Sequence, residues 1–177
     1  MKRLFAVLLM ALCLVSIPVS GEGFDSDDIF DAVTRYGIPT VETVNTLKAN
    51  ADALFSAGNY SKACHIYQEA ADRADFLAKI MIRCIEPYYN DTSDSKSLPD
   101  TISDDLIALE SKANELILLR NVCYVYNGIC YSRDFTNEYG KQNGFIQLLN
   151  SLSLIESSQK DIWSLAVREI MNIINFH

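Results

Sequence analysis

The sequence predicts an all-α protein. From residue 40 onward, apolar residues recur at spacings of three and four, which is the period of an amphipathic helix. No segment shows the sustained alternation of apolar and polar residues that is typical of a half-buried strand. The segment 123–131 offers one alternative, because its aromatic and β-branched residues around Asn127-Gly128 could form a β-hairpin. The helical period continues through that segment, so we favour a helix.

The N-terminus has the three parts of a secretory signal peptide. Lys2 and Arg3 precede an apolar stretch over residues 4–15, and small residues follow it. This stretch is shorter than the roughly 17–25 residues that a membrane-spanning helix needs. Val19 and Gly21 suit the two positions that signal peptidase reads, so we predict cleavage after Gly21 and an extracytoplasmic or secreted protein.

Two alternatives stay open for the N-terminal segment. Lipidation at Cys13 is disfavoured by the bulky Leu12, and an uncleaved segment over residues 4–19 would act as a membrane anchor. The expected organisation has three parts: a signal peptide (1–21), an acidic segment (22–39) and a helical domain (40–177).

The net charge is strongly negative. The whole chain carries −8, and removal of the two cations Lys2 and Arg3 with the signal peptide leaves −10. A protein that binds nucleic acid needs a cationic surface to neutralise phosphate groups, so this balance argues against nucleic-acid partners. It argues equally against anionic lipid surfaces. We expect membrane contact only through an uncleaved N-terminal segment.

The helical domain is expected to contain five helices, separated by turn-forming and capping residues. Their expected ranges are 40–57, 61–88, 102–133, 144–157 and 160–175. Gly58-Asn59 separates the first two, and Ser61 can cap the second. The polar stretch 90–100 is expected to be an exposed loop, and residues 134–143 interrupt the helical pattern.

Residues 47–70 resemble a tetratricopeptide repeat. Small side chains allow two paired helices to approach closely, large ones fill the space between them, and a glycine makes the turn. The residues that fit this pattern are Ala51, Leu54, Gly58, Tyr60, Ala63, Tyr67 and Ala70. The chain departs from the family at Leu47, where tryptophan is usual, and at Asn50, where leucine is usual.

A second, poorer match begins at Tyr124. Gly128 and Tyr131 occupy the small and the large position of a first helix, again with an asparagine, Asn127, in place of leucine. The small, large and small positions of its partner helix are Gly144, Leu148 and Ser151. The resemblance implies antiparallel helical hairpins stacked as a short array, with the helix at 160–175 as a C-terminal cap.

Tetratricopeptide repeats are scaffolds that hold proteins or peptides on a concave surface. The resemblance therefore implies an exported interaction module whose partner is a protein or peptide in the cell envelope or outside the cell. The alternative is a structural or self-assembling helical protein that lacks a ligand groove. A concave face lined by exposed aromatic residues would favour the first function, and the candidates are Tyr88, Tyr89, Tyr124 and Tyr126.

Four cysteines follow the predicted cleavage site. Along a single helix, Cys64 and Cys84 would lie about 30 Å apart and Cys123 and Cys130 about 10 Å apart, beyond the roughly 7 Å limit for a disulfide. An antiparallel pair of helices brings Cys64 near the second pair. We expect at most one bridge, from Cys64 to Cys130 or Cys123. The alternative is that all four are small core residues.

The sequence shows no catalytic arrangement, so neither an enzyme nor a metal or cofactor site is expected. His65 and Glu69 lie four residues apart but lack a further ligand. Cys64 and His65 are neighbours on a helix, so their side chains point about 100° apart and cannot serve each other as nucleophile and base. The acidic residues between 91 and 105 lack the spacing of a calcium-binding loop.

Two glycosylation sequons are present, at Asn59 and Asn90. Both fall in predicted turns, where an acceptor asparagine is accessible. They are therefore the candidate glycosylation sites of an exported chain.

Overall fold

The structure is a computed structural model that describes residues 33–34, 37–89, 100–134, 136 and 138–175. The chain divides into two compact units, residues 1–35 and 36–177. In the first unit only Val33 and Thr34 are described, and both are helical. The expected signal peptide, most of the acidic segment and nearly all of the 90–100 loop, including Asn90, lie outside the described residues.

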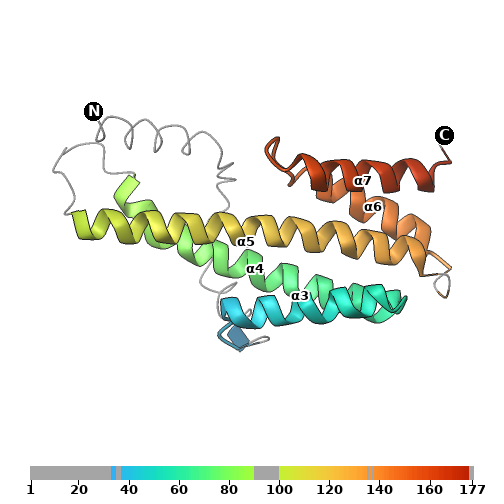
Figure 1. The fold of residues 1–177 in the computed structure, drawn as a ribbon, viewed down its shortest axis with the longest axis horizontal. Helices are drawn as coiled ribbons and strands as arrows, with labels where there is room; N and C mark the ends of the chain where they lie inside the picture. Colours follow the sequence, from blue (N-terminus) through green and yellow to red (C-terminus); the bar gives the residue numbers. More distant parts are fainter. Residues whose placement is uncertain (1–32, 35–36, 90–99, 135, 137, 176–177) are drawn as a thin grey trace. The chain divides into compact units, whose positions relative to one another are not determined.

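The second unit is all-α in its described residues, as the sequence predicts. It contains α3 (Val41–Ser56), α4 (Tyr60–Tyr89), α5 (Asp100–Arg133), α6 (Gly140–Leu152) and α7 (Lys160–Ile173) (Figure 1). In the described part of the chain, no helix combines the length and the apolar character needed to cross a membrane. The β-hairpin alternative for residues 123–131 is wrong, because these residues are part of α5.

Capping residues define both ends of α3. Thr40 Oγ1 accepts a hydrogen bond from the backbone N–H of Thr43 at 3.1 Å and so caps the first turn. After the last turn, Gly58 has a φ of +73°, a left-handed conformation that glycine adopts without steric cost. The N–H groups of Gly58 and Asn59 bond to carbonyl groups in the last turn of α3, which stops the helix.

Asn59 caps α4, which corrects the expectation that Ser61 does so. The Oδ1 atom of Asn59 accepts a hydrogen bond from the N–H of Lys62 at 3.4 Å, and α4 starts at Tyr60. Asn59 is half-buried and is also the acceptor of the first sequon. Its side chain therefore already serves a structural purpose at the start of the helix.

The long helix α5 runs antiparallel to α4, and polar contacts set the register between them. Arg120 Nη1 lies 2.6 Å from Asp75 Oδ1, and Asn127 Nδ2 donates to the carbonyl of Cys64 at 2.9 Å. Buried apolar residues fill the space that α3, α4 and the middle of α5 share. They include Val44, Ala74, Ala78 and Leu116.

Helix α6 packs against the last turns of α5 through two glycines. A Cβ atom at Gly144 would lie only 2.7 Å from the carbonyl oxygen of Gly128 and 2.7 Å from the backbone nitrogen of Ser132. The buried face of α6 is made of Gly140, Gly144, Leu148 and Ser151. The helix covers 140–152 rather than the expected 144–157, because this face extends four residues before Gly144.

Helix α7 lies beside both α5 and α6 and runs parallel to α5. Near its start, Gln159 accepts a hydrogen bond from Asn121 of α5, and near its end Glu169 pairs with Arg133. The apolar cluster that these three helices share consists of Val125, Ile129, Leu148, Ala166 and Ile170. The helix ends at Ile173, within two residues of the expected boundary.

We expect Gly144→Ala to destabilise the protein by about 1–2 kcal/mol. The new methyl group would meet backbone atoms of α5, which cannot rotate away, and overpacking of this kind costs about 1–3 kcal/mol. The helical preference of alanine offsets only about 0.5–1 kcal/mol of that loss. Urea unfolding followed by circular dichroism measures the difference. Gln142→Ala, on the exposed face of α6, is the control, and equal stability of the two variants would contradict the close contact.

Candidate functional site

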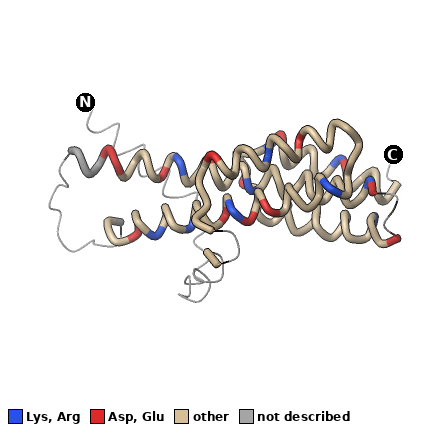
Figure 2. The backbone as a smooth tube through the Cα atoms, turned by 90° about the horizontal axis from the view of Figure 1, so that it is seen from below, with Lys and Arg blue, Asp and Glu red and all other residues tan. Residues whose placement is uncertain are grey.

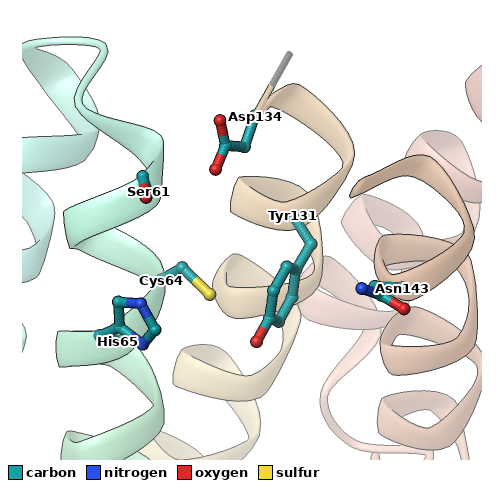
Figure 3. Close-up of a pocket in the computed structure, with 6 residues that line it drawn as sticks. All are labelled: Ser61, Cys64, His65, Tyr131, Asp134 and Asn143. Carbon is teal, nitrogen blue, oxygen red and sulfur yellow. The ribbon is translucent and has the colours of Figure 1, made fainter. Parts of the chain in front are cut away.

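A polar cavity of about 280 Å³ opens between α4, α5 and α6. We call it the Cys64 cavity, and its lining residues are Ser61, Cys64, His65, Tyr131, Asp134 and Asn143 (Figure 3). The first turns of α4 contribute three of them, the end of α5 contributes Tyr131 and Asp134, and the first turn of α6 contributes Asn143. The cavity therefore exists only because three helix ends meet.

Packing of α4 on α5 fixes the inner wall of the cavity. Cys64 is 3% exposed, and its Sγ lies 3.3 Å from Asn127 Nδ2, below the cavity. Tyr131 is one helical turn beyond Asn127, and its hydroxyl hydrogen-bonds to the Cys64 thiol. Figure 3 shows the thiol pointing toward the Tyr131 ring. Both side chains are held by the same helix contact that closes the core.

The electrostatic environment keeps the Cys64 thiol protonated. Burial is the largest cause of its raised pKa, and the negative charge of Asp134 adds to it. Hydrogen bonds from Tyr131 and Asn127 act in the opposite direction but do not overcome burial. The pKa of Tyr131 is also raised, first by its hydrogen bond to Cys64 and then by burial. Since the thiolate is the nucleophile, this arrangement does not activate the cysteine.

Histidine and carboxylate groups do not converge on a metal site in the described residues. No cluster of three or more histidine, cysteine, aspartate or glutamate side chains there could hold an ion. Glu69, which follows His65 by one turn, is engaged with Arg73 at 2.5 Å. His65 is exposed at the rim of the Cys64 cavity, on a different face of α4 from the buried Cys64 thiol.

The residues assigned to repeat packing gather in one core cluster. Ala51, Ala63, Tyr67 and Ala70 are fully buried there. Leu54, Tyr60 and Tyr131 are partly buried against the same cluster. Gly58 lies in the exposed turn between α3 and α4, and Gly128 lies instead at the contact of α5 with α6.

All four cysteines in the described residues are free thiols. Cys64, Cys123 and Cys130 lie in the same buried cluster, and Cys84 is exposed on α4. The expected bridge from Cys64 to Cys130 or Cys123 is therefore not formed in this structure. The positions agree with the alternative for three of the cysteines, which act as small core residues, but not for Cys84.

The aromatic candidates for a concave face have different surroundings. Tyr124 and Tyr126 are half-buried and pack against the core, and the Tyr126 ring stacks on the Tyr67 ring with centroids 5.4 Å apart. Tyr124 also donates a hydrogen bond to Asp72 at 3.2 Å. Tyr88 is exposed at the end of α4. The side chain of Tyr89 lies outside the described residues.

Buried polar contacts of α5 were missed by the sequence analysis. Glu169 is 8% exposed and accepts hydrogen bonds from Ser132 and, through both carboxylate oxygens, from Arg133. The Arg133 guanidinium in turn lies 5.6 Å from the centre of the Phe55 ring. Asn121 is fully buried and donates to the carbonyl of Leu154 at 2.9 Å. The signal in the sequence that could have indicated these contacts is that Asn121 and Glu169 each fall where the helical period predicts an apolar residue.

We expect cysteine-directed reagents to distinguish Cys84 from the other thiols. Burial raises the pKa of Cys123 and Cys130 to about 12, so at pH 8 only about one molecule in 10⁴ carries either thiolate. The Cys64 pKa is raised as well. Iodoacetamide should therefore label Cys84 first, and mass spectrometry of the peptides identifies the labelled positions.

Unfolding in guanidinium chloride without a reducing agent provides the control for this labelling. All of these thiols should then react, whereas a bridge from Cys64 would keep two of them unlabelled. Fast labelling of Cys130 in the folded protein would contradict the burial and the raised pKa.

Comparisons with protein-family models, with curated proteins and with solved structures give no significant match for this chain.

Proposed function

We propose that this chain is an exported, tetratricopeptide-like interaction module that binds an apolar segment of another protein or a peptide. The observation that carries the proposal is a set of large apolar side chains left exposed on α6, on the loop after it, on α7 and at the residue that follows α7. Their members are Ile146, Leu149, Leu154, Trp163 and Ile174, which we call the C-terminal apolar residues. Where exposed apolar side chains form a continuous surface, they mark a site of protein contact.

The exposure of the C-terminal apolar residues is substantial. Ile146 is 55% exposed and Trp163 is 50% exposed, although both belong to helices that bury another face in the core. Tryptophan is also the residue most often found as an energetic centre of protein interfaces. Trp163 is therefore the best single candidate for a contact residue.

The charge of this segment fits an apolar partner. The segment from Gly140 to Ile173 contains three cations and three anions, so its net charge is zero in a chain that carries −8. Figure 2 shows the acidic and basic positions of the described residues along the helices. The C-terminal segment thus lacks the negative excess of the protein as a whole, so an apolar partner that covers it does not have to desolvate an excess of one charge.

Helix packing supports the tetratricopeptide-like part of the proposal. Ala51, Ala63 and Ala70 are buried between α3 and α4, and a second close approach joins α5 to α6 at Gly128 and Gly144. Small residues at paired-helix contacts are the physical basis of such repeats. Helix stacks of this kind need a covered or polar outer end, and α7 instead carries Trp163.

The main alternative is that the C-terminal apolar residues join two copies of this chain. Like charges on the two copies oppose that association, because each copy carries −8, or −10 after the predicted cleavage. We therefore favour a different protein or a peptide in the cell envelope or outside the cell. Mass measurement of the purified protein in solution separates the two, since a strict monomer excludes self-assembly.

We expect a photo-crosslinking amino acid at position 163 to capture a specific protein in the source cells. The same group at position 107 is the control, because Ile107 is 45% exposed on α5 and lies about 21 Å along this helix from Asn121, which bonds to Leu154 in the loop after α6. Mass spectrometry of the products from position 163 should identify one dominant species that position 107 does not give. Adding Leu149→Asp should reduce this product at least tenfold, because a charge would have to be buried.

Several outcomes would count against the proposal. A product from position 163 that contains only this chain would support self-assembly instead. Equal products from positions 163 and 107 would show that the contacts are unspecific. Asn114→Asp introduces the same charge on the exposed face of α5 and should leave the product unchanged.

A further inference from the structure

We propose that the Cys64 cavity binds a guanidinium group, such as the end of an arginine side chain. This site is formed by α4, α5 and the first turn of α6, so the inference does not depend on the C-terminal apolar residues or on the function proposed for them. The contacts that carry it are the charge of Asp134, the polar lining of the cavity and the buried amide of Asn127 below it.

The charge of the cavity favours a cation. Among the described residues that line it, Asp134 is the single acidic one and none is a lysine or arginine. The Oδ1 atom of Asp134 accepts hydrogen bonds from the Thr136 N–H at 3.1 Å and the Thr136 hydroxyl at 2.6 Å, which fixes the carboxylate. Within the described residues, Oδ2 has no hydrogen-bond donor. This oxygen is available to a ligand.

The end of α5 adds to this preference. Its C-terminus carries a partial negative charge next to Asp134, although the Tyr131 carbonyl there accepts a hydrogen bond from the Asp134 N–H at 3.3 Å. The charge of the carboxylate also contributes to the raised pKa of Cys64, which lines the cavity. Helices α4 and α6 begin at the cavity with the opposite partial charge, so the preferred position of the cation is beside Asp134 and Tyr131.

The lining groups match the donor pattern of a guanidinium. This group presents five N–H donors in one plane and cannot lose its charge at neutral pH. Ser61 of α4 and Tyr131 of α5 offer hydroxyl oxygens that can accept its hydrogen bonds (Figure 3). Guanidinium groups also stack on aromatic rings, and Tyr131 forms a wall of the cavity. A compact ammonium ion would use fewer of these contacts.

The buried amide of Asn127, which contacts Cys64 in the lining of the cavity, has an unsatisfied hydrogen-bond acceptor in the described part of the chain. Asn127 is 1% exposed, and both donated bonds of its amide go to Cys64. Its Oδ1 atom has no hydrogen-bond donor among the described residues. A buried acceptor without a donor is costly, so an N–H group that reached this oxygen past Cys64 would stabilise the structure. Asn127, which stands where the resemblance to the repeat leads one to expect leucine, thus lies next to a residue that lines the cavity.

The test is binding of N-acetyl-arginine methylamide to the purified protein, followed by chemical-shift changes in two-dimensional NMR spectra. We expect a dissociation constant on the order of millimolar, because one charged pair and a few hydrogen bonds are formed. The shifted amides should lie in residues 61–65 and 131–143. N-acetyl-citrulline methylamide has the same shape without the charge and should bind at least tenfold more weakly.

Asp134→Asn should weaken arginine binding at least tenfold, while its amide oxygen can still accept the Thr136 hydrogen bonds. Glu138→Gln removes the same charge from an exposed position outside the cavity and should change the affinity less than twofold. Circular dichroism checks that both variants are folded. If Asp134→Asn does not fold, Tyr131→Phe provides the second variant, and it should also weaken binding through loss of the hydroxyl.

Two results would overturn the inference. Equal binding of the arginine and citrulline probes would show that charge is not recognised, and shifts centred away from the cavity would place the ligand elsewhere. If the arginine probe binds as expected, ethylguanidine and a Gly-Arg-Gly peptide separate the two sources of the group. Binding of both indicates an arginine within a polypeptide, whereas binding of ethylguanidine alone indicates a small molecule.

Discussion

The structure depends on how closely α5 approaches its neighbours on two sides. Toward α6, the backbone of Gly128 and Ser132 meets Gly144 so closely that no side chain fits between them. Toward α4, Asn127 bonds to Cys64 and Arg120 pairs with Asp75, so the two helices are in contact over several turns. Because α7 contacts both α5 and α6, its position also depends on the distance between those two helices. A change in this spacing would move every other helix of the second unit.

Polar side chains in the core decide which of several similar packings is adopted. Small apolar residues would allow α4 or α7 to slide by one turn along α5 with little loss of buried area. Asn127, Asn121 and Glu169 remove this freedom, because each is buried and finds its partners at one register only. In any other register these groups would be buried without partners, at a cost of about 1–3 kcal/mol or more for each. The polar contacts thus give specificity to a core whose stability comes from apolar contacts.

The helices could be predicted from the sequence, but their polar partners and the cavity could not. Apolar spacing within each segment is a local signal, and it located all five helices and the turn at Gly58. The start of α6 was displaced because Gly140 has little helical preference of its own and is held by packing on α5. Asn127 and Cys64 are far apart in sequence, so nothing local indicates that the Asn127 amide meets a carbonyl of α4. The Cys64 cavity combines residues from three segments, and its composition follows only from the register of the helices.

The unequal lengths of the helices have a mechanical consequence. Helix α5 has 34 residues and is about 51 Å long, whereas α7 has 14 residues and is about 21 Å long. In the described residues, α3, α6 and α7 pack against the part of α5 from Leu116 onward, whereas Leu106 of α5 and Ile85 of α4 are buried beyond that part. Local opening costs less where fewer helices hold a segment. The first turns of α5 should therefore open more readily than its last turns, which pack against α6 and α7.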